Sequence, residues 1–420
     1  MKIILAAKSV YPFHPFGGVQ KYVYYFAKHL LKAGLDVEII APLDEGKPRT
    51  EYFEGVKYTL IGPRISSYLE LPVGWLGVHW FGQKLARYLR GKPFDILHSF
   101  DMTGLYYLSV PGRSPLCAHI FSDNYLCNPI SIIKYLSLFG YKPHDIKKTK
   151  IALSPFAGLK AIAKYPAQYF FKTKPMHRYL AGCERVFLED EYFREEVVRL
   201  FRLDPAKVRV IPVGVDVGYA RKQMEAAALT RAQLGFSKDD LVLLTVNRLA
   251  ADKGIDKIIL ALKTIRLSIP AAKLVIVGKG YQEEELLSLI ASNGLVEHVR
   301  LFQDVQEEDL YAYYKISDLY ICAFSFPGSS ISTLEAMAVG LPVVTTAQPW
   351  LVPAGRNGAL IPDNQPSTIA RAVLAVIAQD LKAKGAASAD IVKDYDWPQI
   401  ARRAKELYQE ICPTPSFSDI

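Results

Sequence analysis

The chain has 420 residues, of which 50% are hydrophobic and 22% are charged. It is therefore long enough for two or three domains with large buried cores, and the composition excludes a disordered protein. Five cysteines without a CxxC pair argue against a disulfide framework and a zinc site. The net charge of +9 lies in one block, residues 131–178, which holds ten Lys and Arg residues and one acid.

The first half of the chain alternates short apolar runs with amphipathic stretches, which is typical of parallel α/β domains. A helix is predicted over residues 18–34, because Tyr22, Phe26 and Leu30 recur at helical spacing and Gly34 suits a C-terminal cap. Strands are predicted at residues 2–7, 36–41, 56–61, 94–99, 115–120, 185–188 and 208–212. This pattern predicts an N-terminal Rossmann-like domain over residues 1–212.

The second half repeats the alternation more regularly. Strands are predicted at residues 241–246, 273–278, 299–302, 319–324 and 342–346, and helices near residues 254–267, 281–293, 307–316 and 331–339. We therefore predict a second Rossmann-like domain over residues 213–396. In the last segment, 397–420, a helix over residues 397–411 places Ile400, Ala404 and Leu407 on one face.

Two cations follow the strand at residues 241–246, in the sequence NRLAADKG. Side chains at the carboxyl end of such a strand point into the crevice where doubly wound sheets bind ligands. Arg248 and Lys253 suit a diphosphate there, Arg248 by a bidentate fork and Lys253 as a point charge. Taken alone, the two residues fit ordinary surface charges on a solvated loop better than a binding site.

A second candidate anion site lies in the sequence SSISTLEAMAVG. Ser329 and Ser330 lead into an apolar helix, whose N-terminal N–H groups can bind an anion. Glu335 falls about one turn inside this helix, where its carboxylate could accept both ribose hydroxyls. A capped helix with a Glu on its surface has the same sequence pattern.

Four further residues are weaker candidates. Gly17 and Gly18 separate the first strand from the first helix, where glycine lets the backbone approach a phosphate closely. His119 and His98 end two predicted strands, and an imidazole there could bind a sugar hydroxyl or assist proton movement. Taken alone, the glycines fit a plain strand-to-helix turn, and the histidines fit a structural role better than a functional one.

Taken together, the sequences GGVQKYVYYFAKHLLKAG, VRVIPVGVD, NRLAADKG, VGKG and STLEAMAVGLPVV resemble the family-4 retaining glycosyltransferases of the GT-B fold. The resemblance covers nearly the whole chain. It implies two Rossmann-like domains facing across a cleft, with the acceptor on the N-terminal one, the nucleotide-sugar donor on the C-terminal one, and a last helix that crosses back. It further implies a hexosyltransferase-like enzyme of glycoconjugate biosynthesis that needs no metal or other cofactor.

The resemblance also implies roles for individual residues. Arg248 and Lys253 would bind the donor diphosphate, together with Gly17, Gly18, Ser330 and Ile331. Glu335 would bind the ribose, and His119 would contact the donor sugar as a catalytic residue. The donor-sugar region would lie at Pro327 and Gly328.

The chain departs from the family pattern at the donor-sugar region. Pro327 replaces the first of two glutamates, Ala323-Phe324 replaces a Pro-Ser pair, and Val213 replaces an Asn. Proline has neither a carboxylate nor an N–H, so the contacts that the family's first glutamate makes with the donor sugar are either missing or made by other groups. A degenerate chain that acts as a scaffold is therefore one alternative, and an epimerase or phosphorylase on the same fold is another.

Residues 125–180 form a basic, aromatic insertion in the first domain. Cations interleaved with rings suit an anionic membrane surface, and residues 67–90 have the same character. We predict either peripheral docking near a lipid-linked or glycan acceptor, or an insertion whose rings pack inward. Nucleic-acid binding is not expected, because no recognition motif is visible. A short N-terminal apolar run and the lack of a long uncharged one predict a cytoplasmic chain, free or at the inner face of the membrane.

Overall fold

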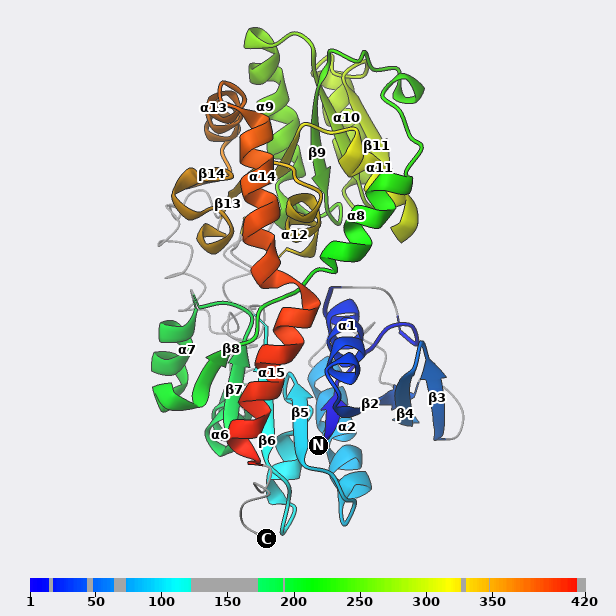
Figure 1. Cartoon of the computed structure of the whole chain (residues 1–420), viewed down its shortest axis with the longest axis vertical. Coiled ribbons are helices and arrows are strands. Elements are labelled where there is room, and N and C mark those ends of the chain that lie inside the picture. The colour runs from blue at the N-terminus through cyan, green and yellow to red at the C-terminus, as the bar shows by residue number, and fades with distance from the viewer. Residues whose placement is uncertain are drawn as a thin grey trace. The chain divides into compact units, whose positions relative to one another are not determined.

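The computed structural model describes residues 1–14, 18–43, 48–63, 73–121, 173–191, 193–325, 330–346 and 348–413. These residues fold into two compact units (Figure 1). The first unit contains the elements up to residue 213 together with the last helix. The second unit runs from Gly214 to Asp396.

The first unit is built around a largely parallel sheet, whose strands alternate with helices along the chain. Its strands are β1 (Lys2–Ala6), β2 (Asp36–Leu43), β3 (Arg49–Phe53), β4 (Val56–Pro63), β5 (Ile96–Phe100), β6 (Leu116–Ile120), β7 (Arg185–Leu188) and β8 (Val208–Val210). Its helices are α1 (Gly18–Lys32), α2 (Val73–Leu89), η1 (Leu105–Ser109), α6 (Lys174–Gly182), α7 (Arg194–Phe201), η3 (Pro205–Lys207) and α15 (Trp397–Ile411).

The order of strands in the first sheet is β3-β4-β2-β1-β5-β6-β7-β8. From β1 the chain moves outward through β2 to β4, then returns to the other side of β1 with β5. This reversal is the switch point of a Rossmann-like sheet. The sequence patterns did not predict β3, which pairs antiparallel to β4 through the Glu54-Gly55 turn.

Helix α15 belongs to the first unit and lies beside α1 (Figure 1). The face predicted from the sequence is confirmed, because Ile400, Ala404 and Leu407 are all buried. Trp397 at the start of the helix is also buried and contacts the rings of Tyr22 and Tyr25 on α1. The last helix is therefore an integral part of the first core.

The second unit repeats the alternation of strands and helices. Its strands are β9 (Leu241–Val246), β10 (Ala272–Val277), β11 (Val299–Phe302), β12 (Leu319–Cys322), β13 (Val343–Thr346) and β14 (Gly358–Ile361). Its helices are α8 (Val217–Ala226), η4 (Ala232–Leu234), η5 (Ala251–Lys253), α9 (Ile255–Ser268), α10 (Glu283–Ser292), α11 (Glu307–Lys315), α12 (Ile331–Ala338), η6 (Pro349–Leu351), η7 (Pro353–Gly355), α13 (Pro366–Ile377), α14 (Leu381–Ile391) and η8 (Val392–Tyr395).

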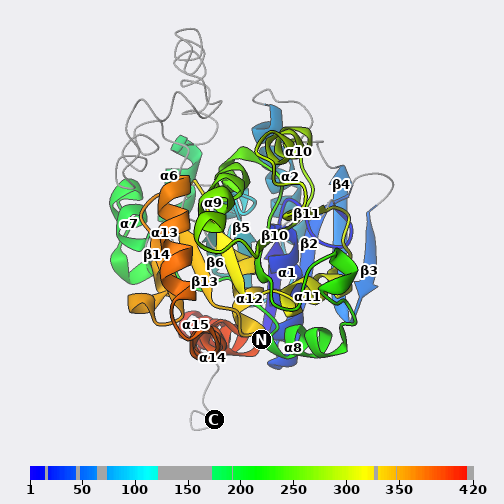
Figure 2. The same ribbon diagram turned by 90° about the horizontal axis from the view of Figure 1, so that it is seen from above.

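The second sheet is parallel throughout, in the order β11-β10-β9-β12-β13-β14. This is the doubly wound Rossmann order, with its switch point between β9 and β12. Helices α9 and α13 lie side by side, and both contribute to one apolar core with the strands (Figure 2). The predicted fold class, with two Rossmann-like domains, is therefore confirmed for the described chain.

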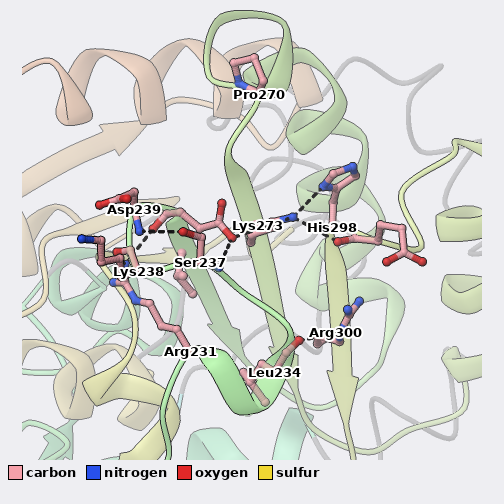
Figure 3. Close-up of polar contacts among 12 residues, drawn as sticks. Arg231, Leu234, Ser237, Lys238, Asp239, Pro270, Lys273, His298 and Arg300 are labelled. Carbon is pink, nitrogen blue, oxygen red and sulfur yellow. Dashed lines mark hydrogen bonds and ion pairs between the residues drawn. The ribbon is translucent and has the colours of Figure 1, made fainter.

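A polar network closes the edge of the second sheet where the strands begin (Figure 3). Arg231 donates to the carbonyls of Ile316, Lys238 and Asp240 and to the carboxylate of Asp318, at 2.8–3.1 Å. Asp318 in turn accepts from the N–H of Val242, the second residue of β9, at 2.8 Å. Arg231 and Asp318 therefore bind groups of the protein at this edge. A ligand site is expected at the opposite edge, where the strands end.

Within the described ranges, no helix is both long and apolar enough to cross a membrane. Most of the basic insertion predicted at residues 125–180 lies outside the described residues; α6 is the part of it that the structure describes.

Candidate functional site

Two cations lie at the carboxyl edge of the second sheet, directly after β9. Arg248 is largely exposed, with 67% of its side chain accessible, whereas Lys253 is at 24%. Asp252 contacts both, at 3.6 Å from Arg248 and 3.0 Å from Lys253. The carboxylate of Asp252 thus keeps both cations close together on this loop. Arg248, Asp252 and Lys253 together carry a net charge of +1. This edge is electrostatically prepared for an anion.

Three glycines allow the loops at this edge to lie against each other. Gly254 ends η5 with a φ of +64°, and a Cβ there would stand 2.1 Å from the carbonyl oxygen of Ala323. A Cβ on Gly278 or Gly280 would meet the carbonyl oxygens of Asn247 and Leu249 at 1.8 and 2.2 Å. These glycines therefore have a packing role: they press the loops after β10 and β12 onto the cationic loop after β9.

Phe324 stands in the segment after β12, where the family pattern has a Pro-Ser pair. Its buried ring lies 4.1 Å from the ammonium of Lys253, in a cation–π contact. The next residue, Ser325, donates its N–H to the carbonyl of Asp252 at 2.8 Å. The segment after β12 is thereby fixed to the loop that carries both cations.

Glu335 lies in the second turn of α12 and is buried, with 6% of its surface accessible. Tyr314, on α11, donates its hydroxyl to the Oε2 atom of Glu335 at 3.0 Å. Burial and the nearby Glu335 carboxylate raise the pKa of Tyr314, so the phenol keeps its proton and remains a donor. Tyr314 thus fixes the orientation of the carboxylate, a contact that the sequence patterns did not predict.

A chain of hydroxyl groups holds the start of α12. Ser330 caps the helix by accepting from the N–H of Thr333, and its Oγ lies 3.0 Å from that of Ser332. Ser332 also contacts the hydroxyl of Tyr320 on β12 at 2.8 Å. Ile331 is the first residue of the helix. The positive end of α12 is therefore held by the strand that adjoins the cationic loop.

The remaining glycine positions are described only in part. Gly18 is the first residue of α1, and no described atom lies within 4 Å of the point where a Cβ would stand. Packing among the described residues therefore does not explain the absence of a side chain at Gly18. Gly17, Pro327 and Gly328 lie outside the described residues.

His119 lies on β6 in the core of the first unit and is fully buried. The rings of Tyr22, Phe100 and Phe121 surround its imidazole, with centroids at 5.0–5.2 Å. Burial lowers the pKa of His119 to about 3, so it is neutral at pH 7. His98 on β5 is its polar neighbour. The predicted contact of His119 with a donor sugar stays a prediction.

The structure therefore brings Arg248, Lys253, Ser330, Ile331 and Glu335 to one edge of the second unit, whereas Gly18 and His119 belong to the first unit. Two cations, a helix N-terminus and an oriented carboxylate can bind a phosphate chain at one end and a pair of hydroxyls at the other. This combination is the chemistry that a nucleoside diphosphate requires.

Two family models together match most of the chain. The model described as glycosyltransferase family 4 matches residues 16–219, and the one described as glycosyl transferases group 1 matches residues 227–389. A phosphatidyl-myo-inositol mannosyltransferase of Mycobacterium leprae is 26% identical over 97% of this chain and 96% of its own length. An alpha-monoglucosyldiacylglycerol synthase of Acholeplasma laidlawii is 24% identical over 53% of this chain and 54% of its own length.

Solved structures share the fold. A sucrose-phosphate synthase from Thermosynechococcus elongatus superimposes with a TM-score of 0.73 at 18% identity, covering 98% of both chains. The E. coli structure described as trehalose-6-phosphate bound with UDP-2-fluoro glucose gives 0.71 at 13% identity, covering 99% of this chain and all of that one. At such identities the likeness extends to the fold alone.

Proposed function

Because the chain belongs to the family-4 glycosyltransferases of the GT-B fold, we propose that it transfers a hexose from a nucleoside diphosphate to a lipid-linked or glycan acceptor with retention at the anomeric carbon. The observation that carries the donor side is the common location of Arg248, Lys253 and Glu335 at the switch point of the second sheet. The acceptor class follows the names of the relatives, which act on phosphatidylinositol or a diacylglycerol.

In this proposal the protein stabilises the leaving diphosphate without a metal ion. Arg248 and Lys253 offset the negative charge that develops on the diphosphate as the sugar–phosphate bond breaks. The N-terminus of α12, with Ser330 and Ile331, adds a fixed partial positive charge. Turnover is therefore expected to continue in excess EDTA, and NMR of the product should show the anomeric configuration of the donor.

Calorimetric titration with UDP, GDP and ADP tests the donor side directly. One of the three is expected to bind with a 1:1 stoichiometry, and the tightest binder identifies the base of the donor. The corresponding nucleotide sugars are then offered as donors, with release of the nucleotide as the measured quantity. The absence of binding by all three nucleotides would sink the proposal.

The competing function is a scaffold that has lost its activity, motivated by Pro327. No comparison supports it, and the chain retains both cations and Glu335 in one place. The contact between Phe324 and Lys253 indicates a rebuilt site, because a new side chain occupies the altered segment and touches a cation of the donor site. We therefore favour an active transferase with an altered grip on the donor sugar.

We also propose that helix α2 of the first unit contacts an anionic membrane surface. Trp80, Lys84 and Arg87 are exposed, and their spacing of four and three residues places them on one face of the helix. Trp80 has 57% of its surface accessible, which is unusual for so large a ring. An exposed indole beside two cations suits the interface, where rings lie at the headgroup level and cations contact anionic lipids.

Flotation with liposomes checks this proposal. The wild-type chain is expected to float with vesicles that contain phosphatidylglycerol and not with pure phosphatidylcholine vesicles. At about 1 kcal/mol for each cation near the surface, the variant K84E/R87E should lower the partition coefficient roughly 30-fold or more. The variant K263E/R402E makes the same change of charge at exposed positions elsewhere and should float normally. Equal loss in both variants would contradict a specific role of α2.

A further inference from the structure

Three polar rings form a row in the core of the first unit. The hydroxyl of Tyr408, on α15, lies 2.5 Å from Nδ1 of His98, on β5. The other nitrogen of that ring, Nε2, lies 3.1 Å from Nδ1 of His119, on β6. All three residues are fully buried. The row therefore connects the last helix of the chain to His119 through one shared histidine.

The row has one favoured direction of hydrogen bonding. Burial raises the pKa of Tyr408 and lowers the pKa of both histidines, so all three rings are neutral at pH 7. Among the described residues, His98 is the hydrogen-bond partner of the Tyr408 hydroxyl. In the reverse direction the proton of this buried hydroxyl would have no acceptor, which is costly. Tyr408 therefore donates to Nδ1 of His98.

The direction at Tyr408 determines the proton positions of the next two rings. A neutral imidazole carries one proton, so His98, accepting at Nδ1, carries its proton on Nε2 and donates it to His119. His119 then accepts at Nδ1 and carries its own proton on Nε2. The two hydrogen bonds of the row therefore select one tautomer of His119, in which Nε2, the nitrogen farther from His98, is a hydrogen-bond donor.

That far nitrogen has no partner within the part of the chain that the structure describes. Nε2 of His119 is buried and makes no hydrogen bond there, and the same is true of the hydroxyl of Tyr22 on α1. A buried polar atom without a partner is destabilising and rare in native proteins, so its retention needs an explanation. His119 lies one residue before the end of β6, at the edge of a doubly wound sheet where ligands bind.

We propose that Tyr408 and His98 are positioning residues that hold His119 in its Nε2–H tautomer, so that it donates a hydrogen bond to an oxygen atom of the substrate. This inference rests on the proposed function, because it assumes that a substrate reaches His119. It excludes His119 as a general base through Nε2, since that nitrogen already carries the proton. It also gives α15 a part in the reaction, through a tyrosine 310 residues from His98 in the sequence.

The tautomer is measured directly by long-range ¹H–¹⁵N correlation NMR of the full chain labelled at histidine. His119 should show a protonated Nε2 and an unprotonated Nδ1 in the wild type. In Tyr408→Phe the phenol no longer fixes His98, and His119 should show a mixture of both tautomers. Tyr179→Phe is the matched control: it removes another fully buried hydroxyl from the same unit, one that contacts the carbonyl of Ser99, and should leave His119 unchanged.

Kinetics provide the second measurement, with release of UDP from UDP-glucose or of GDP from GDP-mannose as the assay. Tyr408→Phe should lower kcat roughly tenfold, the loss of about one hydrogen bond, while the Kd of the nucleotide diphosphate stays within about twofold of the wild-type value. His98→Gln keeps an acceptor and a donor on one side chain and should retain more activity than His98→Phe.

An unchanged tautomer of His119 in Tyr408→Phe would overturn the inference, and so would equal activity of His98→Gln and His98→Phe. Failure of the proposed function has a different signature, because the wild-type chain would then neither bind a nucleotide diphosphate nor release one from these donors. In that case the NMR experiment still decides whether Tyr408 and His98 set the tautomer of His119.

Discussion

Replacing Lys253 by alanine is expected to weaken the binding of the cognate nucleoside diphosphate roughly 30–150-fold, because a charge-assisted contact to phosphate contributes about 2–3 kcal/mol. Lys253 is three-quarters buried and held by Asp252 and by the ring of Phe324, so it is already oriented before the ligand arrives. Arg248 is more exposed and is expected to show a smaller loss, since it must be ordered on binding.

The control for Lys253 lies four residues further along the chain. Lys257→Ala removes the same charge from α9, where Lys257 pairs with Asp256 at 3.2 Å, and should leave the Kd within about twofold. The nucleoside monophosphate should be less sensitive to Lys253→Ala than the diphosphate. Equal losses for Lys253→Ala and Lys257→Ala would show that only the net charge of this region matters.

Glu335 offers a sharper experiment, because the ligand can be changed as well as the protein. Glu335→Gln keeps the shape of the side chain and an acceptor for Tyr314 but removes the charge. We expect roughly tenfold weaker binding of the ribonucleotide and a smaller loss for its 2′-deoxy form, which retains only one of the two hydroxyls. Equal effects on the two nucleotides would show that the carboxylate does not bind the ribose.

The stability of the first unit is expected to fall as the pH drops from 6.5 to 5. Burial lowers the pKa of His119 to about 3, and burial and the neighbouring His119 lower the pKa of His98. In this window the unfolded chain binds protons that the folded chain does not, so stability decreases with decreasing pH. Each buried histidine contributes a slope that approaches about 1.4 kcal/mol per pH unit below pH 6.5, or about 1.6 kcal/mol over the whole window.

Urea unfolding at a series of pH values measures this slope. The double variant H98Q/H119Q should unfold with a midpoint that changes much less between pH 6.5 and 5. Glu38, whose pKa is lowered by its hydrogen bonds to Thr59 and Lys57 against the opposing effect of burial, loses its contribution only at lower pH, as it becomes protonated. A slope that is the same in the wild type and the double variant would assign the acid sensitivity to other groups.

The sequence predicts most of the fold because buried parallel strands are continuous apolar runs, and the runs at β1, β9 and β10 are unmistakable. It does not predict β3, an edge strand that carries an exposed ion pair between Arg49 and Glu51. It also misses β14, where Gly358 is required because a Cβ would stand 1.7 Å from the carbonyl oxygen of Val343. Close backbone approach of this kind leaves no periodic signal.

The sequence predicts the charged residues of the candidate site, but it does not predict the aromatic residues that contact them. Arg248, Lys253 and Glu335 are identified by local sequence, since each lies at a fixed distance from a strand or helix end. Tyr314 and Phe324 support them through contacts between separate elements, and an aromatic residue in a helix or after a strand has no feature that marks such a role. The row from Tyr408 to His119 requires the fold of the whole first unit.

The return of α15 to the first unit has a consequence for the continuity of the polypeptide. Among the described residues, the chain passes from the first unit to the second after residue 213 and returns before residue 397, so that residues 214–396 form a segment inserted into the first unit. Next to these passages, Val215 donates its N–H to the carbonyl of Tyr395 at 3.0 Å, and Val217 donates to the side chain of Asp396 at 3.1 Å. A single proteolytic cut near residue 213 or near residue 397 therefore leaves the two units covalently joined through the other position.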